Sequence, residues 1–483
     1  MKRVFAYIVC FLLIISDICA QQADSLFAYN DSLRMKKHPW RAAIQTLGIN
    51  ATVWAYDRYI REAGFSYISI HSVKDNIKRG FVWDNDPFSI NLLDHPFHGS
   101  FYYNTARSNG LSHWTSLAYT FAGSLSWELF AERESPSLND LISTTIGGAA
   151  LGEGTYRISS LLLDDSKRGA ERFLRELLGT VISPSRGLNR LLSGDAWKVR
   201  HKYYKYHDYE KFPINCSLTT GVRLMADNNH LFRENSNLFL EFNMIYGDLF
   251  KNSTSKPYDY INITSLINVD GNQPLIGSVN IIAQLAGKYL EPLPGHKMSV
   301  GLFHHFDYFD SELVNKDSKV VPFKISEAAA VGVGMCYLLP VTKNVIIRYR
   351  GHLNAILLGG SLTDYYRNQL TGRNYNMGSG YSIKSNTYIE FGKYGSFELN
   401  LFDYHIFTWK GYRSEEVYSD PSTQGDKGNT QLLLINAIMG LNVSPSAKIS
   451  LGSFYYIRNA HYDYHEDVLS RTFEFRLGLK YKF

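Results

Sequence analysis

The last segment of the chain, residues 473–483, alternates strictly between two kinds of side chain. One parity is apolar: Phe473, Phe475, Leu477, Leu479, Tyr481 and Phe483. The other parity is charged or glycine: Glu474, Arg476, Gly478, Lys480 and Lys482. Successive side chains of a β-strand point to opposite faces, so this pattern predicts a strand with one apolar and one polar face. Aromatic residues along the apolar face are typical of strands that contact a membrane.

Runs of the same kind recur from about residue 212 to the end of the chain. The expected strands are 213–225, 236–248, 257–269, 275–290, 296–309, 321–338, 343–358, 378–393, 395–409, 428–443, 446–459 and 469–483. Each run is about ten residues or longer, as a tilted strand that crosses a bilayer needs. Tight turns alternate with long polar loops. We therefore expect residues 212–483 to form a transmembrane antiparallel β-barrel of about 12 strands; the alternative is a large soluble β-sandwich or lipocalin-like barrel.

The N-terminus has the features of a secretory signal peptide. Lys2 and Arg3 precede an apolar run at residues 4–15, and Ala20 is a small residue before the cleavage position. We expect residues 1–20 to be removed on export. The mature chain has no stretch of about 18 consecutive apolar residues, which a membrane-spanning helix requires. Insertion into a membrane then needs a closed barrel, because only helices and barrels pair every backbone group in lipid.

These features together predict the outer membrane of a Gram-negative bacterium as the location. The expected partners are outer-membrane lipids and the barrel-assembly machinery, the latter through the C-terminal strand ending at Phe483. No nucleic-acid partner is expected, because the formal net charge is +5 over 483 residues and no basic block occurs. Cys216 and Cys336 remain after the signal peptide; one disulfide is arithmetically possible, but we expect two buried or lipid-facing thiols.

Residues 21–211 have a different periodicity, and we expect them to form an α-helical domain. Helical spacing dominates at 36–63, 113–134, 137–152, 156–164, 167–181 and 184–193. A short basic and aromatic stretch at residues 198–211 joins this region to the strands, with no Gly/Ser linker. We therefore expect a periplasmic or plug-like domain that packs against the barrel.

Two histidines, His95 and His98, lie in a segment with Pro96 and Gly99, which we expect to be irregular. A His-x-x-His pair can supply two imidazoles to one metal ion, but the helix and glutamate of a zinc-protease motif are missing. The alternative is a pair of hydrogen-bonded structural histidines in a turn. Neither a metal nor a cofactor can be named from this pattern.

The expected helix at 113–134 places two carboxylates on one face with an apolar stripe. The stripe consists of Trp114, Leu117, Phe121 and Leu125. Glu128 and Glu132 fall on the same face, where buried charges need partners. Positively charged candidates are Arg107, Arg133, Arg157, His95 and His98.

One interpretation makes this group an active site. The hypothetical catalytic residues are His95, His98, Glu128 and Glu132. The supporting residues are Asp94, Arg107, Asp140 and Arg157. A glutamate with a raised pKa could act as a general base, or the glutamates and histidines together could hold a metal ion. The alternative is an ion-paired network that locks a helix to a loop.

Small residues and local pairs suggest how the helices pack. Ser137 followed by Asp140 resembles a capping box. Gly148 and Gly152 offer a flat face for a closely approaching helix. Glu153 and Arg157 are spaced as an i,i+4 ion pair. In the expected barrel, Arg348, Arg350 and His352 share the polar parity of one strand, which favours a paired network in the lumen.

A longer string of motifs resembles a known family. It consists of Asp94-His95-Pro96-Phe97-His98-Gly99, Tyr103, Ala106-Arg107-Ser108-Asn109-Gly110, Trp127-Glu128, Glu132, Pro136-Ser137-x-Asn139-Asp140-Leu141, Gly147-Gly148 and Gly152-Glu153. The string is similar to the bacterial family catalogued as domain of unknown function 3943, over roughly residues 80–165. The resemblance implies an exported chain, usually with a barrel-like C-terminal half. It implies no activity and no catalytic residue.

Three functions remain open at this point. The first is an outer-membrane barrel with a structural or envelope-maintenance role. The second is an envelope-lipid hydrolase or modifying enzyme that uses the histidine and glutamate group. The third is a gated porin or transporter with residues 21–211 as plug or gate. A barrel of about twelve strands is intermediate in size, and small barrels tend to be filled by side chains, which argues against an open pore.

Overall fold

The computed structural model describes residues 37–84, 86–199, 214–227, 236–250, 256–269, 273–314, 320–365, 373–409, 411 and 425–483. The expected signal peptide and most of the joining stretch at 198–211 lie outside this part of the chain. The contacts divide the chain into two units. The helical unit contains the described residues up to Asp84 and from Asp94 onward to 199, and the barrel unit contains Asn85–Leu93 and Pro213–Lys482.

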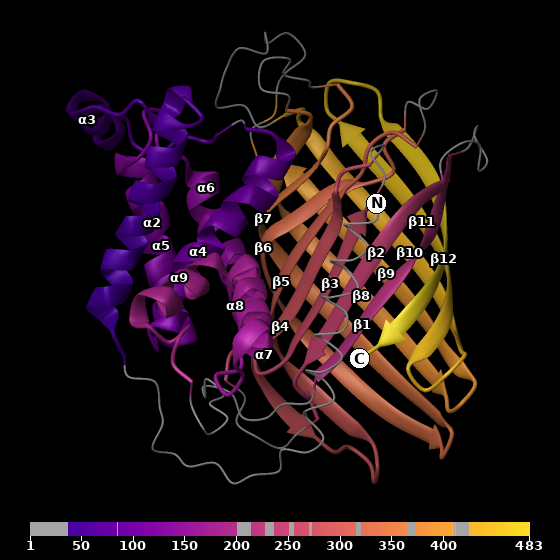
Figure 1. Cartoon of the computed structure of the whole chain (residues 1–483). Coiled ribbons are helices and arrows are strands. Elements are labelled where there is room, and N and C mark those ends of the chain that lie inside the picture. Colours follow the sequence, from indigo (N-terminus) through magenta and orange to yellow (C-terminus); the bar gives the residue numbers. More distant parts are fainter. Residues whose placement is uncertain are drawn as a thin grey trace. The chain divides into compact units, whose positions relative to one another are not determined.

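The helical unit consists of α-helices with short π and 3-10 turns (Figure 1). The elements are α2 (Pro39–Tyr59), η2 (Gly64–Ser66), α3 (Ile70–Arg79), α4 (His95–Ser108), α5 (His113–Phe130), α6 (Leu138–Ile142), η4 (Ser143–Gly147), α7 (Gly148–Leu162), α8 (Gly169–Ile182) and α9 (Pro184–Ser193). The expectation of an N-terminal helical region is confirmed. Ser137 caps α6, because its hydroxyl accepts a hydrogen bond from the Asp140 N–H at 3.3 Å.

The segment around the two histidines is helical, so the expectation of an irregular segment is wrong. α4 begins at His95, directly after the π-helical turn η3 (Ile90–Asp94), and Pro96, which has no N–H to donate, lies at this junction. Gly99 lies inside the same helix. Proline and glycine therefore mark a helix start and a close contact here, and not a loop.

Glycines allow α4 and α7 to cross at backbone contact. A Cβ added to Gly99 would lie 1.8 Å from the carbonyl oxygen of Thr144, and one added to Gly148 would lie 2.7 Å from the Cα of Gly99. A Cβ on Gly152 would lie 2.7 Å from the ring of Tyr103. The flat face expected from the glycine spacing is confirmed, and it fixes the position of every side chain on α4.

The barrel unit is a closed antiparallel barrel of twelve strands, as expected, in which sequence neighbours pair and β1 closes on β12 (Figure 1). The strands are β1 (Ile214–Asp227), β2 (Ser236–Tyr246), β3 (Ile261–Asn268), β4 (Ile276–Leu290), β5 (Lys297–Asp310), β6 (Lys324–Thr342), β7 (Val345–Leu362), β8 (Tyr375–Phe391), β9 (Gly395–Thr408), β10 (Gly428–Asn442), β11 (Ala447–Tyr462) and β12 (Val468–Lys482). Tight turns join β6 to β7 and β8 to β9, whereas 12 or more residues separate β5 from β6 and β7 from β8.

The strand register separates a lumen face from an outer face. On β12, Glu474 and Arg476 are buried and point into the lumen, whereas Leu477 and Leu479 on the outer face are about half exposed. The same division holds around the barrel. Exposed outer-face side chains include Val222, Leu238, Val333, Leu353, Leu357, Ile383, Leu401, Met439, Leu441 and Ile449. The barrel unit thus buries its charged side chains inside and exposes apolar side chains outside.

Side chains from distant strands meet inside the lumen. Lys384 on β8 lies 2.5 Å from the carboxylate of Asp307 on β5 and 2.7 Å from that of Glu327 on β6. The hydroxyl of Tyr404 on β9 donates to Asp307 at 2.7 Å. An apolar cluster from five strands and one loop adjoins this network: Phe323, Ile325, Ala330, Ile356, Tyr404, Ile406, Leu432, Leu434, Phe454 and Tyr456. The described lumen side chains therefore pack across the barrel interior.

A short segment far from the strands in sequence, residues 86–93, is part of the barrel unit and is called the strap. The ring of Phe88 lies 5.3 Å from the rings of both Tyr308 and Tyr375. The amide of Asn91 donates to the hydroxyl of Tyr375 at 2.8 Å. A Cβ on Gly360 would lie 2.6 Å from Leu92. Three strands thus hold the strap by apolar and polar contacts.

Two smaller findings concern the thiols and the helices. Cys216 and Cys336 are both free and buried, as expected. Within the described residues, none of the helices has both the length and the mean hydropathy required to cross a membrane.

Candidate functional site

Helix α4 brings three polar aromatic side chains of the helical unit onto one face. His95, His98 and Tyr102 are spaced by three and four residues, so they lie one above the other. The Tyr102 hydroxyl lies 3.0 Å from Nε2 of His98 and donates a short hydrogen bond to Oδ1 of Asn50 on α2. This face of α4 is one side of the candidate site. We call the site the carboxylate cluster, and it consists of His95, His98, Glu128, Glu132 and Asp140.

Helix α5 and the turn after it form the second side of the carboxylate cluster. Trp127 lies edge-on to the His98 ring, with ring centroids 5.1 Å apart, and its indole N–H donates to Glu132 at 2.5 Å. Glu128 is buried, with 1% of its surface exposed, and its carboxyl group accepts a hydrogen bond from the Ser137 N–H at 2.7 Å. α5 thus places both glutamates at the side of the site that faces α4.

Glu128 has an unusual electrostatic environment. Burial raises its pKa well above the ordinary value, and the neighbouring carboxylates of Glu132 and Asp140 raise it further. The Ser137 N–H opposes this rise only in part. Among the described residues, no lysine or arginine forms an ion pair with Glu128. The raised pKa favours the protonated form of Glu128, which can donate a hydrogen bond or a proton.

The two histidines differ in how far they are buried and in their charged neighbours. His98 is enclosed, and burial together with the charge of His95 lowers its pKa to about 3, so it is neutral at pH 7. His95 lies nearer the surface, with 15% of its side chain exposed, and its Nε2 is 3.5 Å from Oδ1 of Asp140. The amide of Asn139 donates to the same carboxylate oxygen at 2.8 Å. An accessible imidazole beside a held carboxylate can accept a proton or bind a cation.

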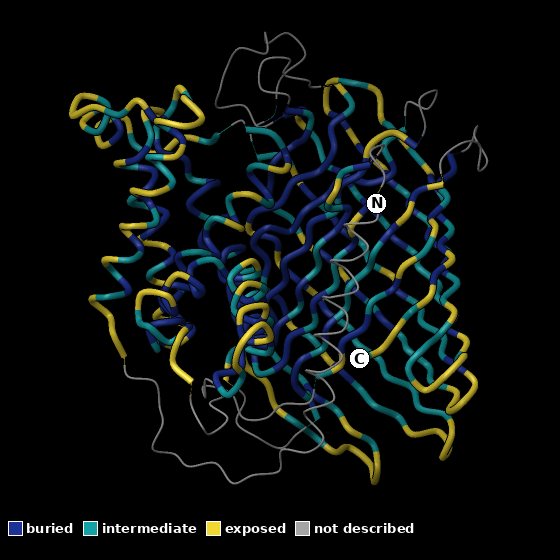
Figure 2. Tube along the Cα trace, viewed as in Figure 1, coloured by how far each residue is buried: buried dark blue, intermediate teal, exposed yellow. Residues whose placement is uncertain are grey.

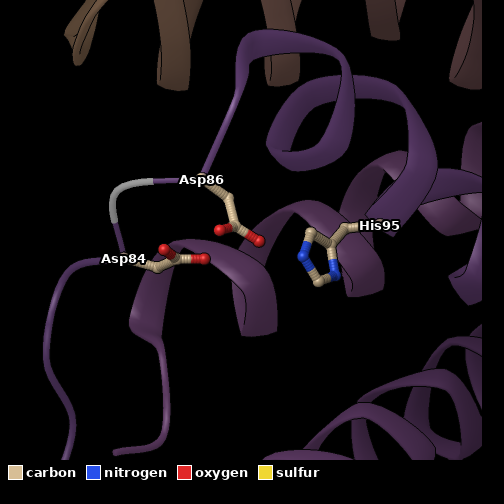
Figure 3. A group of neighbouring side chains, drawn as sticks. All are labelled: Asp84, Asp86 and His95. Atoms are coloured by element: carbon tan, nitrogen blue, oxygen red, sulfur yellow. The ribbon is translucent and has the colours of Figure 1, made fainter. Parts of the chain in front are cut away.

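One further carboxylate approaches His95. Figure 3 shows Asp84 and His95, whose potential ligand atoms lie within 4.8 Å of each other. The backbone N–H of Asp84 donates to Oδ1 of Asn139 at 2.7 Å, so the same asparagine orients both Asp84 and Asp140. Asp86, also drawn in Figure 3, begins the strap and belongs to the barrel unit. Nitrogen and carboxylate oxygen donors of this kind suit divalent transition-metal ions.

A second buried cluster of the helical unit contains two arginines, Arg107 and Arg157, around one glutamate, Glu153. We call it the arginine cluster. Glu153 on α7 accepts hydrogen bonds from Nε of Arg107 at 2.8 Å and from Nε of Arg157 at 2.9 Å. Tyr103 donates to Glu153 at 2.9 Å and contacts Nδ1 of His113 at 2.7 Å. Burial alone would raise the pKa of Glu153, but the two guanidinium groups hold it well below its ordinary value. The i,i+4 pair of Glu153 and Arg157 is confirmed.

The expected site residues therefore separate into two groups. His95, His98, Glu128, Glu132 and Asp140 all line the carboxylate cluster. Arg107 and Arg157, considered as partners for Glu128 and Glu132, bind Glu153 instead. Asp94 is exposed at the surface.

The expected apolar stripe of α5 is not a buried face. Trp114 and Phe121 are exposed by 56% and 45%, whereas the buried positions of this helix include Ser116, Thr120 and Ser124. The interpretation of the stripe as the inner face is therefore wrong. The partners of the two glutamates include the indole N–H of Trp127 for Glu132 and the backbone N–H of Ser137 for Glu128, and neither of these belongs to the expected stripe.

Three site residues were not predicted: Tyr102, Asn139 and Asp84. Tyr102 follows His98 by four residues, so a helical interpretation of residues 95–108 would have placed it beside the histidine. Asn139 and Asp84 are far apart in sequence, and their hydrogen bond is a tertiary contact that carries no local signal.

The lumen residues singled out from the sequence lie on β7 and form local pairs. Arg350 donates to Oδ1 of Asn386 at 2.8 Å, and Arg348 lies 2.9 Å from Glu390. His352 is buried, and its ring centroid lies 4.9 Å from that of His305. These residues contribute to lumen packing and do not contact one another as a single site.

Comparison with solved structures finds other β-barrels of low similarity. A structure described as a NanC porin is 9% identical with a TM-score of 0.28, covering 55% of this chain and all of that one. A KdgM porin is 10% identical with a TM-score of 0.24, covering 55% of this chain and 99% of that one. Omp33, an outer membrane protein of Acinetobacter baumannii, is 10% identical with a TM-score of 0.22, covering 56% and 98%. At these scores the similarity carries no argument about function.

Comparison with curated protein sequences gives no match. A family model does match, over residues 80–185, a range that contains both buried clusters of the helical unit. The family is DUF3943, described as a domain of unknown function, and it is the family that the motif string between Asp94 and Glu153 resembles.

Proposed function

We propose that this chain is an outer-membrane β-barrel protein with a structural or envelope-maintenance role, whose lumen is closed by its own side chains. The observation that carries this proposal is the inversion of polarity in the barrel unit. Charged residues such as Lys384 and Glu474 are buried inside, and leucines such as Leu353 and Leu477 are exposed outside. The proposal takes up the expectation that residues 1–20 direct export and that residues 21–211 and 212–483 form two domains.

The outer face of the barrel supports a lipid environment. Burying apolar surface away from water is favourable by about 25 cal/mol for each square ångström, and large apolar side chains that face water lose this stabilisation. A closed barrel leaves no unpaired strand edge, which is the condition for strands to lie in hydrocarbon. Both features fit a barrel that lipid surrounds.

The inside of the barrel supports a closed lumen over a gated porin or transporter. Lys384 and Tyr404 reach Asp307 from strands three and four positions away around the barrel. Arg476 on β12 bonds Glu474 beside it and reaches Glu241 on β2 at 3.1 Å. A wide aqueous channel would leave such lumen side chains to water, whereas here they bond to side chains two to four strands away.

The test is a bilayer measurement on the full chain. We expect purified protein in planar bilayers to give no stepwise conductance, while an open general porin measured in parallel gives steps. Density-gradient fractionation of cells should place the protein with outer-membrane markers. Reproducible conductance steps would favour the transporter, and recovery in a soluble fraction would contradict the barrel proposal itself.

A second candidate function is an enzyme that acts on an envelope lipid through the carboxylate cluster. It is favoured by the raised pKa of Glu128 and by the partly exposed imidazole of His95, which lies 3.5 Å from Asp140, a charged neighbour of Glu128. A neutral carboxyl group can act as a general acid and a neutral imidazole as a general base in one reaction. His98 and Glu132 would position these groups through Tyr102 and Trp127.

Envelope-lipid mass spectrometry tests this second function. We would compare the wild type, a deletion strain, and the deletion complemented with His95→Asn, His98→Ala or Glu128→Gln at verified abundance. Glu134→Gln is the matched control, because Glu134 is an exposed carboxylate next to the same helix. The enzyme predicts a lipid change that the site variants fail to restore and the control restores. If no lipid changes in the deletion strain, the enzyme hypothesis fails.

A further inference from the structure

Helices α8 and α9 have their apolar residues on the outside. The exposed positions of this helix pair include Phe173, Leu174, Leu177, Val181, Leu188, Leu191, Leu192 and, just beyond α9, Trp197. Charged exposed residues occur only at the ends of the pair, at Arg168 and Glu171 before it and Lys198 after it. The outer face between these ends is thus apolar.

The buried face of the same pair is charged. It contains Arg172, Arg175, Arg186 and Arg190, each less than 9% exposed. Arg172 and Arg190 both bind Asp165 and Glu176 at 2.7–2.9 Å.

The other two arginines are held by different partners. Arg175 binds Glu171 at 2.9 Å and the carbonyl of Leu162 at 3.2 Å. Arg186 donates to the carbonyl of Tyr156 at 2.6 Å, and its guanidinium lies over the Tyr156 ring. Every buried guanidinium of the pair thus has acceptors within the helical unit.

Helix α2 continues the apolar surface. Arg41 and Gln45 on α2 bond the side chain of Asn189 on α9 at 2.7 and 3.0 Å, so the two helices are neighbours. The exposed residues of α2 include Trp40, Ile44, Leu47, Tyr56 and Tyr59. Between Trp40 and Tyr59, a range that is described throughout, no exposed residue is charged. Figure 2 shows these helices with exposed outer faces.

This arrangement is the reverse of a helical domain in water. In an aqueous helical domain the apolar side of each helix faces the core and the charged side faces water, and arginines are rarely buried unless they are paired, as these four are. Contiguous exposed apolar surface over three helices is instead found where a protein meets lipid or another apolar surface. The outer face of the barrel unit has the same composition.

The residues at the ends of this apolar surface indicate whether lipid or another protein contacts it. Lys37 and His38 precede Trp40, and Arg61 follows Tyr59, all of them exposed. On α9, Trp197 is followed by Lys198. Aromatic residues next to basic ones at the limits of an apolar face match the boundary between acyl chains and headgroups. A surface that binds another protein would not require aromatic residues next to basic ones at both ends of α2.

We propose that the outer faces of α2, α8 and α9 contact the acyl chains of membrane lipids, with these aromatic and basic residues at headgroup level. This inference rests on the proposed outer-membrane location of the barrel. It replaces, for these three faces, the aqueous periplasmic surroundings expected from the sequence. It also gives the carboxylate cluster of the same unit a position close to lipid.

Spin-label accessibility in the full chain, reconstituted in phospholipid vesicles, tests the proposal. Single cysteines would replace Leu47, Leu177 and Leu191 in a chain whose native cysteines are changed to alanine. Lys78→Cys on the polar helix α3 is the water-exposed control, and Leu477→Cys on β12 reports the barrel surface. Folding of each variant would be verified by protease resistance before labelling.

We expect labels at the three helix positions and at Leu477 to collide with dissolved oxygen and to be shielded from a water-soluble nickel chelate. The label at Lys78 should show the reverse. If the helix labels behave like Lys78 while Leu477 stays lipid-like, the inference is overturned and the barrel proposal stands. Helix labels shielded from both agents would indicate a protein cover and also overturn it. A water-accessible Leu477 would contradict the barrel proposal.

Discussion

The two buried glutamates of the helical unit have nearly the same exposure and opposite electrostatics. Glu128 and Glu153 are each 1% exposed. Burial raises the pKa of Glu128 and nearby carboxylates raise it further, whereas two arginines hold the pKa of Glu153 down. Burial depth therefore does not distinguish the two residues, but charge compensation does.

The difference separates a structural role from a functional one. Glu153 is ionised, and Arg107 and Arg157 neutralise its charge. These ion pairs hold α4 against α7, and they leave the carboxylate unavailable for proton transfer. Glu128 has the carboxylates of Glu132 and Asp140 as its charged neighbours, and Asp140 in turn lies 3.5 Å from the partly exposed His95. Perturbed groups without compensating charges concentrate at functional sites, which is why the carboxylate cluster is the better candidate.

The largest effect is expected from replacing each glutamate by glutamine. Glu153→Gln removes the carboxylate that two buried guanidinium groups share and should lower the free energy of unfolding by about 3–5 kcal/mol. Glu128→Gln replaces a carboxyl group by an amide of similar shape and, compared at pH 4.5, should change it by about 1 kcal/mol or less. Denaturant unfolding of the full chain in lipid, followed by protease resistance of the helical unit, measures both. Equal losses would remove the distinction.

Two adjacent tyrosines on α4 offer a second, smaller test. Tyr103→Phe removes a hydrogen bond to Glu153, and Tyr102→Phe removes the one to Asn50. Each should cost about 1–3 kcal/mol because a buried acceptor loses its donor.

Only Tyr102→Phe should also alter the function of the carboxylate cluster, which the lipid profile described above would detect. A lipid change in Tyr103→Phe at wild-type abundance would show that the arginine cluster takes part in the chemistry.

The smallest expected effect is a pH dependence of opposite sign for the two residues. The folded pKa of Glu128 is raised above its ordinary value of 4.5, so its contribution to stability is lost as pH rises above 4.5. The folded pKa of Glu153 is lowered, so its contribution is present above 4.5 and lost as pH falls below it.

Glu128→Gln should therefore gain stability over the wild type as pH rises above 4.5, by less than about 1.4 kcal/mol for each pH unit. Unfolding curves measured at several pH values compare the two proteins. Parallel pH profiles for wild type and Glu128→Gln would show that Glu128 is ionised in the folded protein.

The barrel could be predicted from the sequence almost strand by strand. The sequence pattern that predicts each strand is local, because the alternation of apolar and polar residues and the turn that ends it both lie within about ten residues. The register shifts between Leu266 and Ile267 and between His305 and Asp307 could not be predicted, because they depend on the neighbouring strand.

The helical unit was harder to predict for two physical reasons. Pro96 and Gly99 resemble loop residues, but one begins a helix and the other permits a backbone contact with α7. Helical spacing predicts a buried apolar stripe on α5, but Trp114 and Phe121 are exposed. Spacing also predicts that Glu128 and Glu132 lie near each other, which holds although α5 ends at Phe130 and Glu132 lies in the turn after it. Their partners cannot be predicted in this way, because those contacts are tertiary.

The strap has a consequence for how the protein is made. Residues 86–93 belong to the barrel unit, and the next described residue of that unit in the chain is Ile214. Phe88 and Leu92 are therefore synthesised long before Tyr308, Gly360 and Tyr375, the residues that contact them. The part of the barrel unit that the ribosome makes first thus cannot pack until β5, β7 and β8 have been made.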